Sequence, residues 1–167
     1  MNVVMDACSV INLNNGGALE TVCSIATIDV QIGPIAGGEC SEGCASALAE
    51  LHQAGLIQYL TDTPLDADAF LEFVEEHGLG DGEAECIMLA DLDAETVICC
   101  DDMKGRKKAK SILGENRIIG SIGLLKWAVD DGLISVTQAH ESYVLMKDAG
   151  GFLPDVDAHY FGDSGAN

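Results

Sequence analysis

Short apolar runs alternate with amphipathic segments along most of the chain. The runs expected to form strands lie at residues 3–5, 28–32, 56–60, 96–100 and 117–119. Segments with apolar residues at helical spacing lie at 18–26, 35–54, from Thr63-Pro64 onward, and at 83–92, 104–113, 121–129 and 135–149. Strands that alternate with helices predict a single-domain α/β/α sandwich, in which helices cover both faces of a central parallel sheet.

The pattern changes after the last predicted helix. Gly150 and Gly151 begin a stretch that contains Pro154 and shows no helical or strand period. We therefore expect residues 1–149 to form the domain and residues 150–167 to be a loosely structured C-terminal tail.

The composition is that of a folded protein with an unusual charge. Of the 167 residues, 48% are hydrophobic, which excludes a disordered chain. The 28 acidic residues outnumber 8 basic ones and give a net charge of −20. A surface this negative repels nucleic acid overall, so a nucleic-acid site has to be a local exception. The charge suits either a salt-adapted proteome or a protein that docks on a basic partner.

The cysteines favour a reducing compartment. There are seven, an odd number, and most lie inside apolar runs. The N-terminus lacks the pattern of a secretory signal, and no stretch approaches 18 apolar residues. We expect a cytoplasmic protein without a membrane segment. A zinc site at Cys40 and Cys44 is the alternative, but no second ligand pair follows at the right spacing.

Six carboxylates stand where a strand ends or a helix begins. They are Asp6, Glu39, Glu83, Glu85, Asp101 and Asp102. Parallel strands end at the same edge of a sheet, so we expect several of these carboxylates to meet there. Such a cluster needs a cation, and Mg²⁺ or Mn²⁺ is the usual ion for sites made of oxygen ligands. A metal held with an open coordination position suits phosphodiester hydrolysis.

Each acid also has a structural interpretation. Glu39, Glu83 and Glu85 complement the N-termini of their helices. Asp101 caps the helix that follows it, and Asp102 is solvated. The metal hypothesis therefore depends on the joint placement of the acids and not on any one of them.

Five of the eight basic residues lie within seven positions directly after the acidic pair. They are Lys104, Arg106, Lys107, Lys108 and Lys110. One interpretation is an RNA-binding helix that grips phosphates beside the metal site. The other is a solvated helix face.

Five segments, taken in order, resemble PIN-domain nucleases. Residues 3–13 resemble the opening of these proteins, and residues 34–39 resemble their second motif. The best match is Leu-Gly-Asp-Gly-Glu-Ala-Glu-Cys-Ile-Met-Leu-Ala at residues 79–90, which is similar to the third motif of a toxin-like, VapC-type subfamily. Residues 97–109 resemble the fourth motif, and residues 118–125 continue the similarity. Together the resemblance covers about residues 2–133.

The resemblance implies a role for each acid. Asp6 is the first metal ligand, Glu39 the second acid, and Asp101 the fourth-motif acid with Asp102 beside it. In the third motif the alignment favours Glu85, with Glu83 as the next choice.

Periodicity does not choose between Glu83 and Glu85, because their side chains point about 200° apart on a helix. The position two residues after the first Asp, which is Ser or Thr in many members, is Cys8 here. Cys8 is a weak hydrogen-bond donor, and Ser9 stands next to it.

The resemblance also implies a function. It implies a Mg²⁺- or Mn²⁺-dependent endoribonuclease, the toxin of a toxin–antitoxin pair, with RNA as substrate. It further implies a homodimer and an antitoxin protein whose segment covers the site. The alternative is a PIN-like protein-binding module with weak or no catalysis, which would not need a divalent metal.

Overall fold

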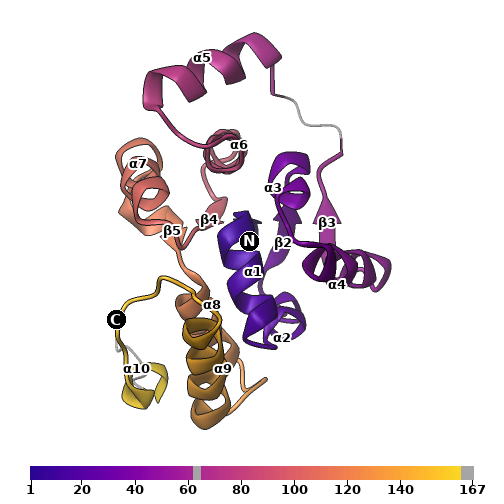
Figure 1. Ribbon diagram of the computed structural model, residues 1–167, viewed down its shortest axis with the longest axis vertical. Helices are drawn as coiled ribbons and strands as arrows, with labels where there is room; N and C mark the ends of the chain where they lie inside the picture. The colour runs from indigo at the N-terminus through magenta and orange to yellow at the C-terminus, as the bar shows by residue number, and fades with distance from the viewer. Residues whose placement is uncertain (62–64, 163–167) are drawn as a thin grey trace.

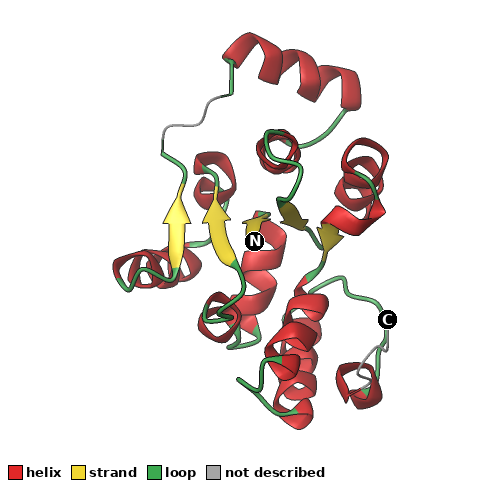
Figure 2. Cartoon of the chain, turned by 180° about the vertical axis from the view of Figure 1, so that it is seen from behind, coloured by secondary structure: helices red, strands yellow, loops and turns green. Residues whose placement is uncertain are grey.

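Five parallel strands form one sheet at the centre of the molecule (Figure 2). The computed structural model describes residues 1–61 and 65–162; residues 62–64 and 163–167 lie outside the description. The strands are β1 (Asn2–Met5), β2 (Asp29–Ile32), β3 (Ile57–Tyr59), β4 (Val97–Cys99) and β5 (Ile118–Ile119). Their order across the sheet is β3-β2-β1-β4-β5, and every pairing is parallel. The predicted α/β fold with a central parallel sheet is confirmed.

Helices surround the sheet in two groups. The helices before β4 are α1 (Ala7–Asn15), α2 (Leu19–Cys23), α3 (Pro34–Gly38), α4 (Glu42–Gln53), α5 (Ala67–His77) and α6 (Asp81–Asp91). Those after it are α7 (Met103–Leu113), the 3₁₀ turn Glu115–Arg117, α8 (Ser121–Asp130), α9 (Val136–Asp148) and α10 (Ala158–Gly162). Figure 1 shows α5, α6 and α7 gathered at one end of the molecule and α8, α9 and α10 at the other. Among the described residues, none of the helices combines the length and apolar character needed to cross a bilayer.

Successive side chains of β1 point to opposite faces of the sheet and therefore join different parts of the core. Val3 and Met5 belong to the larger apolar cluster, which includes residues of α1, α2, α4, α8 and α9. Val4 packs on the other side with Ala36 of α3 and Cys86 of α6. Every one of these strand side chains is buried. A strand buried on both faces is apolar throughout, which explains the continuous apolar run at the start of the chain.

The observed helices depart from the sequence prediction in two places. Helix α1 was not predicted, because Ala7–Asn15 contains Cys, Ser and Asn residues that favour helices weakly. The single helix expected over 35–54 is two helices, α3 and α4. Chain direction changes between them, where Gly38 ends the first and Ser41 is the N-cap of the second. The helix start expected at Thr63-Pro64 lies outside the described residues, and α5 begins after the N-cap Asp66.

The C-terminal segment differs from the expected loose tail as far as residue 162. Phe161 in α10 is completely buried and belongs to the main core cluster. Its ring lies near those of Tyr143 and His140 of α9. A single large aromatic side chain supplies enough apolar area to hold a segment that shows no period of its own. The domain boundary at residue 149 stays a prediction, and residues 163–167 lie outside the described part.

Candidate functional site

Asp6 and Asp101 meet at the point where the strand order reverses. Strands β1 and β4 are neighbours in the middle of the sheet, with Met5 in register with Cys99. The amide of Asp6 donates to the Cys99 carbonyl at 2.9 Å, so the first acid directly extends β1. In open parallel sheets a ligand crevice forms outside the carboxyl ends of the strands at such a reversal. The sequence prediction that strand-end acids share one edge is met by this pair.

Asp6 is buried in surroundings that do not compensate its charge. Its side chain is 2% exposed, and the Cys100 thiol donates to its Oδ2 at 3.4 Å. Burial, with added repulsion from Asp101 and Glu39, raises the pKa of Asp6 to about 6. The Cys100 thiol and the Cys8 backbone oppose this rise without cancelling it. A carboxylate in this position is stabilised by any cation that reaches it.

Asp101 is fixed by two hydrogen bonds from different helices. Asn12 of α1 donates from Nδ2 to Oδ2 at 2.8 Å, and the amide of Ser121 at the start of α8 donates to Oδ1 at 2.9 Å. A Cβ at Gly120 would lie 2.8 Å from Oδ1 of Asp101, so glycine is required for this close approach. Asn12 and Ser121 were not predicted as site residues, although both lie inside the recognised motifs.

Asp102 and Glu83 form a second carboxylate pair. Asp102 is the N-cap of α7 and accepts from the amides of Lys104 and Gly105, both at 2.8 Å. The cap predicted for Asp101 therefore belongs to Asp102. These amides, first of all that of Gly105, hold the pKa of Asp102 below its usual range. Burial, followed by the contact with Asp102 and repulsion from Asp6, raises the pKa of Glu83. The Glu83 carboxylate thus faces the acids at the ends of β1 and β4.

Glu39 reaches the same region from the end of α3. It is the C-cap of that helix, and a Cβ placed on Gly82 would lie 2.6 Å from its Oε2. Its carboxylate therefore lies against the first turn of α6 and is close enough to Asp6 to raise the pKa of that acid.

Glu85 lies at the border of this group, because Glu39 repels it while its hydrogen bonds are to α3. Its side chain is 1% exposed, and its oxygens accept from the amides of Ile35 at 3.0 and 3.1 Å and of Ala36 at 2.9 Å. Both amides lie in the first turn of α3, where the helix itself offers no acceptor. The Glu85 carboxylate therefore acts as the cap that Gly33, which has no side chain, cannot supply. The geometry thus gives Glu83 the place among the acids that the alignment gave to Glu85. Glu85 instead ties α6 to α3.

The two residues after Asp6 have different environments. Cys8 is exposed as a residue, but neighbouring atoms partly desolvate its sulfur, and this desolvation together with repulsion from Asp6 and Asp102 raises the pKa of its thiol to about 11. Ser9 is fully buried in α1. The structure therefore places the neutral thiol of Cys8, and not a hydroxyl, beside the acids.

The donor set suits a hard divalent cation, although the acids are not drawn together into a finished site. Over residues 1–61 and 65–162, no three His, Cys, Asp or Glu side chains converge as ligands of one ion. At the same sheet edge, Asp6 nevertheless experiences repulsion from Asp101 and Glu39, and Glu83 from Asp6 and Asp102. Carboxylate oxygens are the ligands that Mg²⁺ and Mn²⁺ prefer, so their chemistry fits such an ion.

The basic helix α7 presents fewer free charges than its sequence suggests. Lys104 donates to the Gly78 carbonyl, and Lys110 pairs with Glu115. Arg106 turns inward and donates from Nη1 to the carbonyls of Cys100 at 2.7 Å and Ile119 at 2.9 Å.

Two basic side chains of α7 remain available. Lys107 is exposed and Lys108 half-buried, and the described part of the chain offers neither a hydrogen-bond or ion-pair partner. Arg106, by contrast, is not available, because its hydrogen bonds brace the strand ends, and the basic composition of the segment does not reveal this role.

The chain that forms this fold and this acidic sheet edge matches a known protein family. Residues 2–156 match a family of PIN domains (DUF3368), and the chain belongs to it. PIN domains are in general nucleases, and such nucleases generally use divalent metals. The crystal structure of PAE2754 from Pyrobaculum aerophilum is similar in fold, with a TM-score of 0.52 and 19% identity. The match covers 77% of this chain and 99% of that one. A search of curated proteins gave no match.

Proposed function

We propose that this protein is a metal-dependent ribonuclease that hydrolyses RNA phosphodiester bonds. The observation that supports the proposal most directly is the burial of Asp6 beside the carboxylates of Asp101, Glu39 and Glu83 at the reversal point of the sheet. Such a group is electrostatically unfavourable by itself and is relieved by Mg²⁺ or Mn²⁺.

The residues of the chain divide the work between them. Asp6, Asp101 and Glu83 would hold the ion, with Glu39 and Asp102 at its sides. A divalent ion at this edge supplies charge neutralisation and activation of the attacking water. Asn12 and the Ser121 amide fix the orientation of Asp101, which keeps the acid from turning away from the site. Lys107 and Lys108 attract the RNA backbone toward a surface that is otherwise negative.

A variant of Glu83 tests whether the third acid of the site is Glu83, as the geometry indicates, or Glu85, as the alignment favours. We expect Glu83→Gln to lower RNA cleavage by at least about tenfold, because the substitution removes a charge from the ion site. Gln retains an acceptor for the Gly80 amide, which Glu83 binds at 3.1 Å, so the start of α6 is preserved. The measurement is cleavage of a labelled RNA with Mn²⁺, with Mg²⁺ and with chelator, alongside a DNA of the same sequence.

Two variants of the same helix serve as controls. Asp81→Asn removes an exposed charge from the first turn of α6 and should leave cleavage unchanged. Glu85→Gln keeps one acceptor oxygen for the amides of α3 and removes a buried charge, so the folded protein should still cleave RNA. A larger loss of cleavage in folded Glu85→Gln than in Glu83→Gln would return the third acid to Glu85. If RNA is not cut in any metal, the ribonuclease proposal is wrong.

Lys107 and Lys108 are expected to contact phosphates. Replacing both with Gln should flatten the dependence of RNA binding on salt by about one to two units on the logarithmic slope, since each single-strand contact adds about 0.7. The measurement is RNA affinity from low to moderate salt, in chelator so that the RNA stays intact. Lys110→Gln is the control, because its charge is already paired with Glu115. An unchanged slope in the double variant would leave α7 as a solvated face.

The biological setting follows from the motif resemblance alone. We infer that the protein acts in the cytoplasm as the toxin of a toxin–antitoxin pair, as a homodimer whose site an antitoxin segment covers. A small open reading frame directly beside the gene would support this inference. Binding of a protein partner without metal-dependent cleavage would favour a PIN-like binding module.

A further inference from the structure

An apolar cavity of about 800 Å³ opens beside the acids, on the side of β5. Its floor consists of Ile118, Ile119 and Ile122, and its far wall is the C-terminal segment, including Leu153. Asp101 lies at its edge, and Arg106 and Lys147 bring cationic groups to its wall. The volume is within the range of small-molecule sites, and its mixture of apolar lining and few polar groups is typical of them.

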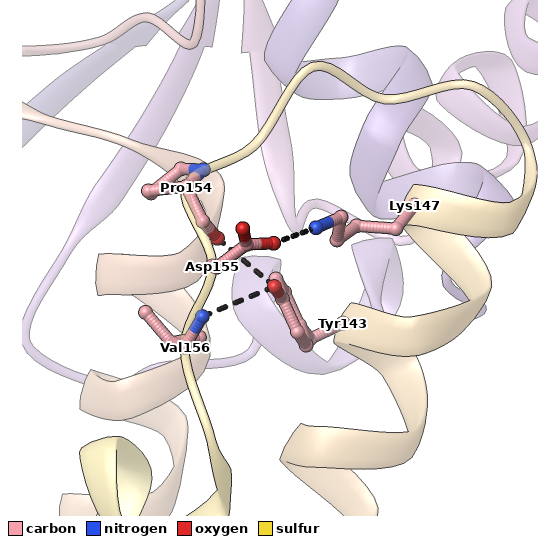
Figure 3. Close-up of polar contacts among 5 residues, drawn as sticks. All are labelled: Tyr143, Lys147, Pro154, Asp155 and Val156. Atoms are coloured by element: carbon pink, nitrogen blue, oxygen red, sulfur yellow. Dashed lines mark hydrogen bonds and ion pairs between the residues drawn. The ribbon is translucent and has the colours of Figure 1, made fainter.

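The C-terminal wall of the cavity is held in place by α9, as Figure 3 shows. The Tyr143 hydroxyl donates to the Pro154 carbonyl at 2.9 Å and accepts from the Val156 amide at 3.2 Å. Lys147 forms an ion pair with Asp155 in the same stretch. Buried Phe161 anchors the chain a few residues later. The cavity is therefore formed before any ligand arrives.

Phe152 stands between this cavity and the acids. It lines the cavity and also a neighbouring hollow of about 280 Å³, whose other walls include Cys8, Asp101 and Asp102. Its side chain is 82% exposed, the most exposed large hydrophobic side chain in the described part of the protein. An exposed aromatic ring beside a charged site offers a face on which a base can stack.

We propose that Phe152 and the apolar cavity bind an unpaired nucleobase of the substrate, next to the phosphate held at the acids. The inference rests on the proposed ribonuclease function and adds to it the place where one base of the substrate is bound. Asp101 lines both this cavity and the neighbouring hollow, and this continuity favours a base over an apolar peptide, because a nucleotide bound at the acids carries its base next to its phosphate. Arg106 and Lys147 on the wall are engaged by backbone carbonyls and by Asp155, so the apolar lining and the ring of Phe152 carry the recognition, and aromatic stacking accepts any base.

The test measures stacking directly, without cleavage. A short, cleavage-resistant single-stranded RNA with one 2-aminopurine is titrated with protein in Mg²⁺, and the quenching of the 2-aminopurine fluorescence is followed. We expect Phe152→Ala to remove most of the quenching and weaken binding about tenfold, and Phe152→Trp to retain both. Leu71→Ala is the matched control, because Leu71 is 64% exposed on α5, outside the residues that line the cavity. A perfectly paired duplex carrying the same base should not be quenched.

The two proposals fail separately. Wild-type cleavage of RNA with equal binding and quenching by wild type and Phe152→Ala overturns the base site and leaves the ribonuclease. Phe152-dependent quenching without any cleavage overturns the ribonuclease and leaves the base site. The absence of quenching in the wild type, or equal quenching by single strand and duplex, also overturns the base site. If a protein partner protects Phe152 and RNA does not bind, the cavity belongs to that partner and our inference is wrong.

Discussion

Replacing Asp6 with Asn is expected to stabilise the metal-free protein and to abolish its activity. The Asp6 carboxylate is buried and repelled by Asp101 and Glu39, and the amide of Asn has no charge to bury. The neutral variant should therefore be more stable than the wild type by about 2–3 kcal/mol at pH 8, since each unit of pKa shift corresponds to about 1.4 kcal/mol. Cleavage should fall about 100-fold or more, because a side chain that holds the ion is lost.

The sign of the pH dependence follows from the raised pKa. Folding moves the pKa of Asp6 from 3.8 to about 6, so between these values the folded state holds more protons than the unfolded state. The stability of the wild type therefore falls as the pH rises through this window, and the penalty is complete above about pH 6. The gain in Asp6→Asn should shrink by about half at pH 5, which is still above the isoelectric point near 4.1.

Urea unfolding in chelator between pH 5 and pH 8 measures this difference. Adding Mn²⁺ should stabilise the wild type more than Asp6→Asn, because only a folded state that binds the ion gains from it. A variant that is less stable than the wild type at pH 8 in chelator would show that Asp6 is well compensated, and equal gains with Mn²⁺ would remove Asp6 from the ion site.

Phe161→Ala should destabilise the protein by about 3–5 kcal/mol, because it empties a fully buried aromatic position. The side chain packs among α8, α9 and α10, where collapse of the cavity would require whole helices to move. Urea unfolding at neutral pH measures the loss. Phe152→Ala is the matched control, since the same substitution at an exposed position should change stability by less than about 1 kcal/mol. Equal, small effects of the two variants would show that the C-terminal segment is as loose as its sequence suggests.

The sequence predicts the sheet well and the helix boundaries less well, for identifiable reasons. Strands buried on both faces are short apolar runs that contrast with their surroundings, so all five predicted runs overlap observed strands. Helix α1 is stabilised by packing on α4, α8 and α9 and not by its own residue preferences, and no local pattern marks it. The division of α3 from α4 lies between Gly38 and the N-cap Ser41, and an apolar period that continues through residues 35–54 does not reveal it.

The site shows the same limit at the scale of single side chains. Strand ends identify Asp6, Asp101 and Asp102, because parallel topology alone brings them to one edge. The choice between Glu83 and Glu85 depends on how α6 is rotated about its axis, and two acids separated by one residue leave that rotation open. Arg106 lies in a basic run, and its spacing alone does not indicate that it turns inward to the carbonyls of Cys100 and Ile119.

The hydrogen bond from the Ser121 amide to Asp101 makes this backbone proton a spectroscopic reporter of the site. The amide nitrogen lies 2.9 Å from Oδ1, so the chemical shift of its proton depends on the charge of the carboxylate that accepts the bond. Titrating ¹⁵N-labelled protein with Mg²⁺ should therefore move the Ser121 resonance early, while the amides of Ile35 and Ala36, bound to Glu85, should respond less. Ion occupancy could then be followed in solution by a nucleus at the start of α8, without substrate and without altering any acid.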